Sequence, residues 1–137
     1  MFTPRASVEL VRSSQLARGV PYAHAAVAHE TSRLVVTAGA CPLDENGVIV
    51  AAGDVAAQAE RVMTNLRLAL RAAEADLSDV VKTTVYVASQ HRADLLTAWE
   101  VVRRHFGDHD APSTLLGVMV LGYPDQLVEV EAIAALP

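Results

Sequence analysis

The sequence VVKTTVYVAS, from Val80 to Ser89, is the segment that decides the fold. It is rich in β-branched valine and threonine, which favour extended backbone and fit the pleated surface of a sheet. Segments with helical periodicity come before and after it along the chain. We therefore expect Val80 to Ser89 to form a central strand of a sheet that carries two helices.

Each of the two helical segments has clear start or stop signals and one apolar face. Asp54, after Gly53, can accept hydrogen bonds from the free amides of a first helical turn, and Gly107 can end the second helix, which begins at Arg92. Apolar side chains recur at spacings of three and four in both segments, namely at Val55, Ala59, Val62, Leu66, Ala69, Leu70 and Ala73, and at Leu95, Ala98, Trp99, Val102 and Phe106. Both helices should pack on the sheet by one side.

The segments before the first helix predict strands and turns. Ser7 to Arg12 alternates polar and apolar residues, as a half-buried strand does. Ala25 to Ala28 and Arg33 to Ala40 are predicted to form an antiparallel pair, with Glu30, Thr31 and Ser32 as the turn. The run Asp44-Glu45-Asn46-Gly47 predicts a tight hairpin turn, since Asn and Gly tolerate positive φ angles.

The end of the chain predicts two further strands, Ser113 to Gly122 and Gln126 to Ala134, joined by a turn at Tyr123-Pro124-Asp125. Strands and helices are segregated, so the expected class is α+β: a mixed, mostly antiparallel sheet of about six strands with two helices on one face. Residues 1–137 are expected to form a single domain. The other sheet face would be bare, and with 52% hydrophobic and 20% charged residues a subunit interface is the expected cover.

Composition argues against several classes of protein. A net charge of -5 and a pI of about 5.4 make nucleic acid a poor partner. Apolar runs such as Leu115 to Leu121 are shorter than the roughly 20 residues that cross a bilayer, and Met1 to Arg18 does not resemble a secretory signal, so we expect a cytoplasmic protein without membrane contact. Cys41 is the single cysteine, the histidines form no ligand-spaced set, and the glycines are scattered. No metal and no cofactor are therefore expected.

Several motifs resemble those of one known family over Pro21 to Leu136. They are Pro21-Tyr22-Ala23-His24-Ala25, Thr37-Ala38-Gly39-Ala40, Pro42-Leu43-Asp44, Gln58-Ala59-Glu60 through Asn65-Leu66, Asp79 to Val85, and Leu127 to Ala134. On these motifs the sequence resembles the Rid family of YjgF-type reactive intermediate deaminases. The resemblance implies a Rid or chorismate-mutase-like fold, a homotrimer with a central barrel of sheets, and small-molecule ligand clefts between subunits.

The sequence departs from the family pattern at its signature strand. That strand usually begins Pro-Ala-Arg-Ser, whereas this chain has Asp110-Ala111-Pro112-Ser113, so Pro112 stands where the arginine belongs. In deaminase members the arginine is understood to bind the substrate carboxylate in a bidentate pair. His24 also replaces the usual glutamine, and Trp99 aligns with a common asparagine. The resemblance therefore implies a changed ligand.

The resemblance assigns Glu129 as the catalytic acid that orients the attacking water. It places the ligand against Tyr22, His24, Gly39, Trp99, Pro112, Ser113 and Thr114. Glu129 and Glu131 are two apart on one strand and face the same side of the sheet. In the alternative interpretation both glutamates form salt bridges between subunits, Trp99 packs in the core, and Cys41 is a buried, inert thiol.

Two functional hypotheses follow. The first is a cofactor-free hydrolase that deaminates small imines or enamines at a cleft between subunits. The second is a trimeric protein that binds or senses a small neutral or cationic metabolite without converting it, which the absence of the arginine favours. A ribonuclease role, attached to some relatives, ranks third because the chain is acidic.

Overall fold

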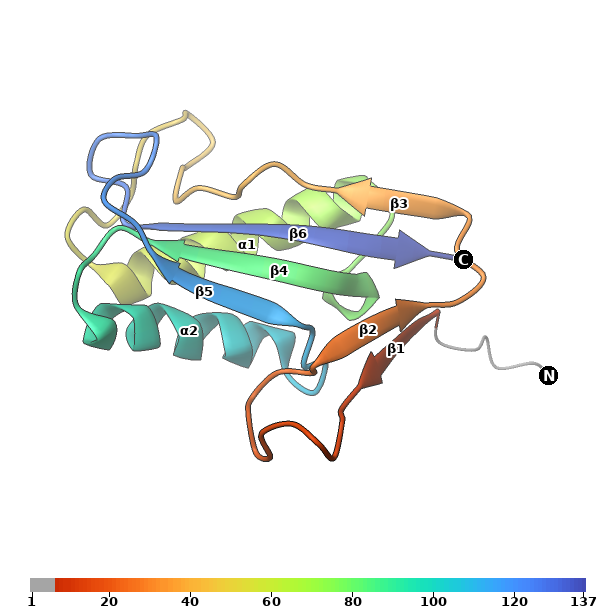
Figure 1. The fold of residues 1–137 in the computed structure, drawn as a ribbon. Coiled ribbons are helices and arrows are strands. Elements are labelled where there is room, and N and C mark those ends of the chain that lie inside the picture. The colour runs from red at the N-terminus through yellow and green to blue at the C-terminus, as the bar shows by residue number, and fades with distance from the viewer. Residues whose placement is uncertain (1–6) are drawn as a thin grey trace.

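A computed structural model describes residues 7–137 and shows six strands and two helices. In chain order they are β1 (Val8–Val11), β2 (Ala25–Ala28), β3 (Arg33–Val36), α1 (Val55–Ala72), β4 (Val80–Val87), α2 (Arg92–Phe106), β5 (Ser113–Gly117) and β6 (Val128–Leu136) (Figure 1). A single 3-10 turn, Leu77–Asp79, leads into β4. The predicted α+β class is confirmed.

The main sheet has four strands in the order β3-β6-β4-β5. Strand β4 lies between β6, to which it is antiparallel, and β5, to which it is parallel, with Thr83 opposite both Ala132 and Ser113. Because parallel neighbours need a crossover, α2 connects β4 to β5. The prediction that the segment from Val80 forms the central strand is confirmed.

The predicted pairing of Ala25 to Ala28 with Arg33 to Ala40 is wrong. Strand β2 pairs with β1 in a separate two-stranded sheet, and β3 pairs with β6. The intervening residues are not a hairpin turn: the His29 amide donates to the Ser7 carbonyl at 2.6 Å, and the Ser32 amide donates to the Leu136 carbonyl at 3.0 Å. In Figure 1, β3 forms one edge of the main sheet and β1–β2 lies beyond the other. Short apolar strands do not specify their partner, so the sequence pattern could not exclude this arrangement.

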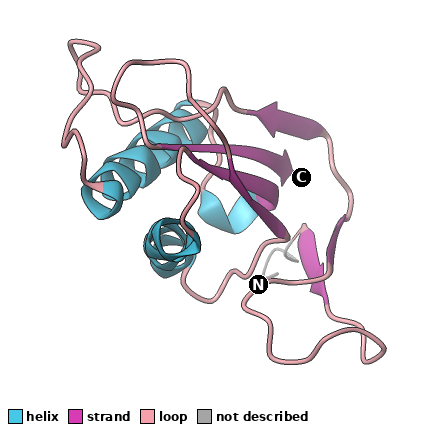
Figure 2. Ribbon diagram, turned by 60° about the vertical axis from the view of Figure 1, so that its left-hand side comes forward, coloured by secondary structure: helices cyan, strands magenta, loops and turns pink. Residues whose placement is uncertain are grey.

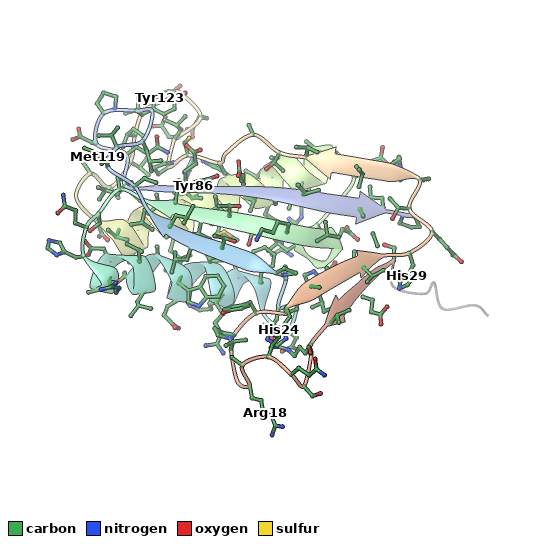
Figure 3. The ribbon with its side chains drawn as sticks, viewed as in Figure 1. Arg18, His24, His29, Tyr86, Met119 and Tyr123 are labelled. Carbon is green, nitrogen blue, oxygen red and sulfur yellow. The ribbon has the colours of Figure 1, made fainter. Side chains whose placement is uncertain are left out.

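The predicted strand Ser113 to Gly122 is too long. Strand β5 ends at Gly117, and the Val118 amide donates a last hydrogen bond to the Val87 carbonyl at 2.8 Å. Beyond it the chain leaves the sheet, with the Met119 side chain 91% exposed, and this segment projects at one end of the molecule (Figure 3). The predicted turn before β6 is confirmed by a Gln126 amide that donates to the Tyr123 carbonyl and by a positive φ at Asp125.

Both helices pack on one face of the main sheet (Figure 2). The buried core combines β4 and β6 residues such as Val85 and Val130 with helix residues such as Met63, Leu66 and Val102. The predicted ends are confirmed, since Asp54 Oδ1 accepts from the Ala57 amide at 3.0 Å and Gly107 follows α2 with φ 61°. No helix within residues 7–137 has both the length and the apolar character to cross a membrane.

Within residues 7–137 no helix covers the other face of the main sheet, which we call the open face. Its edges expose large apolar side chains, with Leu34 66% and Val36 71% exposed on β3 and Leu116 42% exposed on β5. Between these edges runs a stripe of side chains that are mainly polar, made of Lys82, Thr84 and Tyr86 on β4 and Glu129 and Glu131 on β6. Side chains alternate along a strand, so this stripe follows directly from the burial of the intervening residues Thr83, Val85 and Val130.

Candidate functional site

Glu129 projects from β6 onto the open face. Its neighbours Val128 and Val130 are fully buried on the helix side, so alternation turns the glutamate to the opposite side. It lies opposite Tyr86 in the ladder between β6 and β4. The glutamate that the resemblance assigns to catalysis is thus on the half-exposed surface of the sheet.

Two donors hold one oxygen of the Glu129 carboxylate. The Gln126 amide donates to Oε1 at 3.1 Å, and the Cys41 thiol donates to the same oxygen at 3.3 Å. Gln126 is buried and is itself fixed, because it also donates to the Val128 carbonyl and accepts from the Tyr123 amide. Oε2 accepts no hydrogen bond from the described part of the chain. The carboxylate is therefore oriented through Oε1, whereas Oε2 lies against the backbone of Gly39 and has no hydrogen-bond donor among residues 7–137.

Gly39 lies directly against this carboxylate. A Cβ at that position would be 2.6 Å from Cδ of Glu129 and would overlap the carboxylate oxygen. Glycine is the residue that permits such a close approach of backbone to a functional group. The structure thus brings together Gly39 and Glu129, which the resemblance assigned to one site.

The Cys41 thiol is a hydrogen-bond donor in this site. Burial and the neighbouring Glu129 carboxylate raise its pKa from 9.0 to about 11. At neutral pH it is therefore protonated, which is the form that donates to Glu129. Gln126, the second donor, is not singled out by the sequence, because a glutamine at the start of a predicted strand gives no periodic or motif signal.

Two further polar pairs, Tyr86 with Glu131 and Lys82 with Thr114, lie on the open face beside Glu129. The Tyr86 hydroxyl donates to Glu131 Oε1 at 2.7 Å, and this hydrogen bond raises the pKa of Tyr86. The Lys82 ammonium donates to Thr114 Oγ1 at 2.7 Å. Thr114 is therefore on the same face as Glu129, and Glu131 has a partner within its own chain.

Trp99 and Ser113 lie on the other side of the sheet. The Ser113 hydroxyl bonds to the hydroxyl of Thr83, which is fully buried on the helix face. Trp99 packs against the core from α2 and, with Ser113 and Pro21, lines a very small hollow. One chain alone does not bring these two residues to Glu129.

Tyr22 and His24 lie at the opposite end of β4 from Glu129. The Ala23 amide, between them, donates to the Asp110 carbonyl at 2.8 Å, and His109 bonds to the carbonyl of Val80 at the start of β4. Pro112 is also at this end, where its carbonyl accepts from the Thr83 amide.

Both nitrogens of the His24 ring contact backbone groups of the loop between β1 and β2. Nδ1 accepts from the Ser13 amide at 2.9 Å, and Nε2 lies 3.2 Å from the Ala17 carbonyl. Figure 3 shows His24 in this loop, away from Tyr86 on the sheet. The predicted residues thus form two groups: Gly39, Thr114 and Glu129 on the open face, and Tyr22, His24, Trp99, Pro112 and Ser113 elsewhere.

Comparisons with known proteins agree with this architecture. A model of the family described as Endoribonuclease L-PSP matches residues 13–136. Protein DfrA of Myxococcus xanthus is 34% identical over 132 residues, covering 95% of this chain and 97% of that protein. The 2-iminobutanoate/2-iminopropanoate deaminase of Salmonella typhimurium is 35% identical over 103 residues, covering 74% and 78%.

A solved structure of the Rid family protein YyfB from Yersinia pestis superposes with a TM-score of 0.86 at 29% identity, covering 95% of this chain and 99% of that one. The match of the family model over nearly the whole chain agrees with the shared fold. This chain therefore belongs to the Rid (YjgF-type) family, whose family model carries the description Endoribonuclease L-PSP.

Proposed function

We propose that this protein is a cofactor-free hydrolase that deaminates small imine or enamine metabolites, with Glu129 as its general base. The observation that carries the proposal is the Glu129 carboxylate, held through Oε1 by Gln126 and Cys41, while its Oε2 accepts no hydrogen bond within residues 7–137. Relatives support the reaction class: one is named 2-iminobutanoate/2-iminopropanoate deaminase, and one from Acinetobacter baylyi, 29% identical, is named 3-aminoacrylate deaminase RutC.

The reaction needs only water and a group that moves protons. Oε2 of Glu129 takes a proton from water as the water oxygen bonds to the carbon of a protonated imine, and the C=N π electrons move to nitrogen. The carboxylic acid then returns that proton to nitrogen. The C–N bond breaks, its electron pair leaves with ammonia, and the carbonyl forms as the hydroxyl proton passes to solvent. One water is consumed and one ammonia is released.

In this proposal the active form is a homotrimer with its ligand clefts between subunits. The exposed apolar residues of the open face, including Leu34 and Val36, give a second copy a surface to cover. Tyr22 and Ser113 lie far from Glu129 within a chain, so a cleft between two chains is the arrangement that unites them. The missing arginine restricts the substrate to one that is not held by the usual carboxylate clamp.

Ammonia release from a panel of freshly generated imines and enamines tests the proposal. Replacing the base with Glu129→Gln should lower the rate by about 10² to 10⁴-fold, the usual contribution of a general base. Glu100→Gln, at an exposed position on α2, removes the same charge away from the site and should not change the rate. Equal rates for wild type and Glu129→Gln would remove the assignment.

The second candidate is a trimeric protein that binds a small metabolite without converting it. Two features favour it. Pro112 stands at the arginine position, so the usual carboxylate clamp is missing. Glu129 forms no ion pair within residues 7–137, so its charge is available to a cationic ligand. Thermal shift against a metabolite library separates the two functions. A stabilising compound recovered unchanged supports binding, and recovery of a hydrolysed product supports the deaminase.

A further inference from the structure

Asn65 on α1 holds the backbone around Cys41. Its amide nitrogen, Nδ2, donates to the Cys41 carbonyl at 2.8 Å and to the Leu43 carbonyl at 2.9 Å. An amide NH₂ group has two hydrogens, so one hydrogen serves each carbonyl. Both partners are acceptors, which fixes the end of the Asn65 side chain that faces them. In Figure 1, α1 lies behind β6, the strand that carries Glu129.

The chain around Cys41 is held by the sheet on one side and by α1 on the other. Before Cys41, the Ala40 amide donates to the Val130 carbonyl of β6 at 2.7 Å. After it, the Leu43 amide donates to the Cys41 carbonyl at 2.8 Å, but this bond lies within the same segment and does not attach it to the rest of the fold. Among the described residues, Asn65 is the side chain that attaches the Cys41 carbonyl to a helix.

The position of the Cys41 sulfur follows from the position of its backbone. A single rotatable bond, χ1, places Sγ relative to the main chain, so a displaced backbone carries the sulfur with it. The thiol has two acceptors within reach, Oε1 of Glu129 at 3.3 Å and the Gly39 carbonyl at 3.5 Å. A hydrogen bond to a charged acceptor is the stronger of the two. The observed backbone position therefore directs the thiol to the carboxylate.

We propose that Asn65 is a positioning residue of the candidate active site. It holds the Cys41 peptide so that the thiol donates to Oε1 of Glu129, and an oriented carboxylate needs less ordering when it takes a proton from water. Asn65 acts on the helix side of the sheet (Figure 2), so its role does not depend on what covers the open face. Its effect on the reaction rests on the proposed function, whereas its effect on the thiol does not.

The S–H stretching band in the infrared spectrum tests the contact directly. Cys41 is the single cysteine of the chain, so the band has one source, and with a pKa of about 11 the thiol is protonated at neutral pH. A strong hydrogen bond to a carboxylate weakens the S–H bond and lowers its frequency. Glu129→Ala, which lacks the acceptor, supplies the reference frequency. Asn65→Leu should shift the band from the wild-type position most of the way to this reference.

Deaminase kinetics give the second readout. Asn65→Leu should lower kcat by about tenfold to 10²-fold, which is the effect of a misplaced catalytic group. KM should stay near the wild-type value, because Asn65 holds the carboxylate through Cys41 and does not contact the ligand. Asn65→Ala repeats both measurements with the strongest helix former, so the test does not depend on the folding of the leucine variant.

Two control variants separate this role from a general structural one. Arg61 lies about one turn before Asn65 on α1, and its Nε donates to the Leu43 carbonyl at 3.0 Å but not to Cys41. Arg61→Met keeps both Asn65 bonds and should leave the S–H band and kcat at their wild-type values. Val102→Ala removes fully buried apolar volume from α2, so it should lower Tm without shifting the band.

Three results would overturn the inference. One is an S–H band that stays at the wild-type frequency in both Asn65 variants, and another is an equal shift in Val102→Ala, which would make the band a measure of stability alone. The third is a shifted band with unchanged kcat, which would show that the carboxylate does not need the thiol. A shifted band in a protein whose wild type deaminates nothing would reject the deaminase proposal and retain the link from Asn65 to Cys41.

Discussion

The position of the Glu129 carboxylate depends on three residues, of which two are distant in sequence and one, Gln126, carries no motif signal. Gly39 gives it room, while Gln126 and Cys41 hold one of its oxygens. An oriented carboxylate binds and activates water better than a mobile one because less ordering is needed during the reaction. Changes to these neighbours should therefore affect activity more than stability.

Gly39→Ala should displace the Glu129 carboxylate, because the new methyl group would occupy its place. We expect deaminase activity to fall more than about tenfold and the free energy of unfolding to fall by about 1 to 3 kcal/mol, as for other overpacked sites. Ammonia release and urea denaturation measure the two effects. Gly122→Ala, where an added Cβ meets nothing within 4 Å, is the control and should match wild type. An active Gly39→Ala protein would show that the carboxylate position is not needed.

The Cys41 thiol should react with iodoacetamide mainly at high pH, with a midpoint near its pKa of about 11. Removing the charge in Glu129→Gln lowers that pKa toward 9.0, so more thiolate forms and alkylation at pH 8 should accelerate roughly threefold to tenfold. Because the pKa is raised by folding, its contribution to stability is present below pH 9 and is lost between pH 9 and 11. A midpoint near 9 in wild type would contradict the Cys41–Glu129 contact.

Helix α1 fixes the segment that leads into β6 through one buried side chain. Gln58 is fully buried, and its amide nitrogen donates to the Asp125 carbonyl at 2.9 Å while its oxygen accepts from the Leu127 amide at 2.7 Å. This segment contains Gln126 and ends two residues before Glu129. The position of the candidate base is therefore set by a contact between a helix and a loop.

Gln58→Leu should lower the free energy of unfolding by about 1 to 3 kcal/mol, because it leaves the Asp125 carbonyl and the Leu127 amide without their buried partner. Urea denaturation followed by circular dichroism measures the loss. Gln90→Leu is the control at an exposed position, where the change should be within about 0.5 kcal/mol. Equal stability of the two variants would mean that Gln58 is not a structural link between α1 and β6.

In a single chain, large apolar side chains at the edges of the open face are exposed to solvent. Leu34 is 66% exposed on β3, and its side chain makes little contribution to the core of its own chain. Leu68 on α1 is similarly exposed, at 58%, but lies away from the open face. The two leucines therefore separate the effect of an interface from the effect of surface hydrophobicity.

Leu34→Glu should dissociate the proposed trimer, because it places a charge in the interface on every copy. Light scattering should show a change from about three times the 14.6 kDa of one chain to a single chain. Leu68→Glu should leave the mass unchanged, and circular dichroism should show both variants folded. A wild-type protein that is monomeric would contradict the proposal of clefts between subunits.

The sequence by itself determined the two helices with their ends, the central strand and the α+β class. These follow from interactions between neighbours in sequence, such as the Asp54 cap, the apolar spacing and the β-branched run. The motifs that resemble the family pattern also gave Glu129 and Gly39 as candidate site residues, which the structure places side by side.

Only the tertiary structure decided that β2 pairs with β1 and that Gln126 and Cys41 hold Glu129. Strand pairing and side-chain convergence depend on segments that are far apart in the chain, such as Cys41 and Glu129, which are 88 residues apart, and their encounter costs loop entropy and leaves no local pattern. The periodicity of each segment shows which face is buried, and the packing of all segments together decides what that face meets.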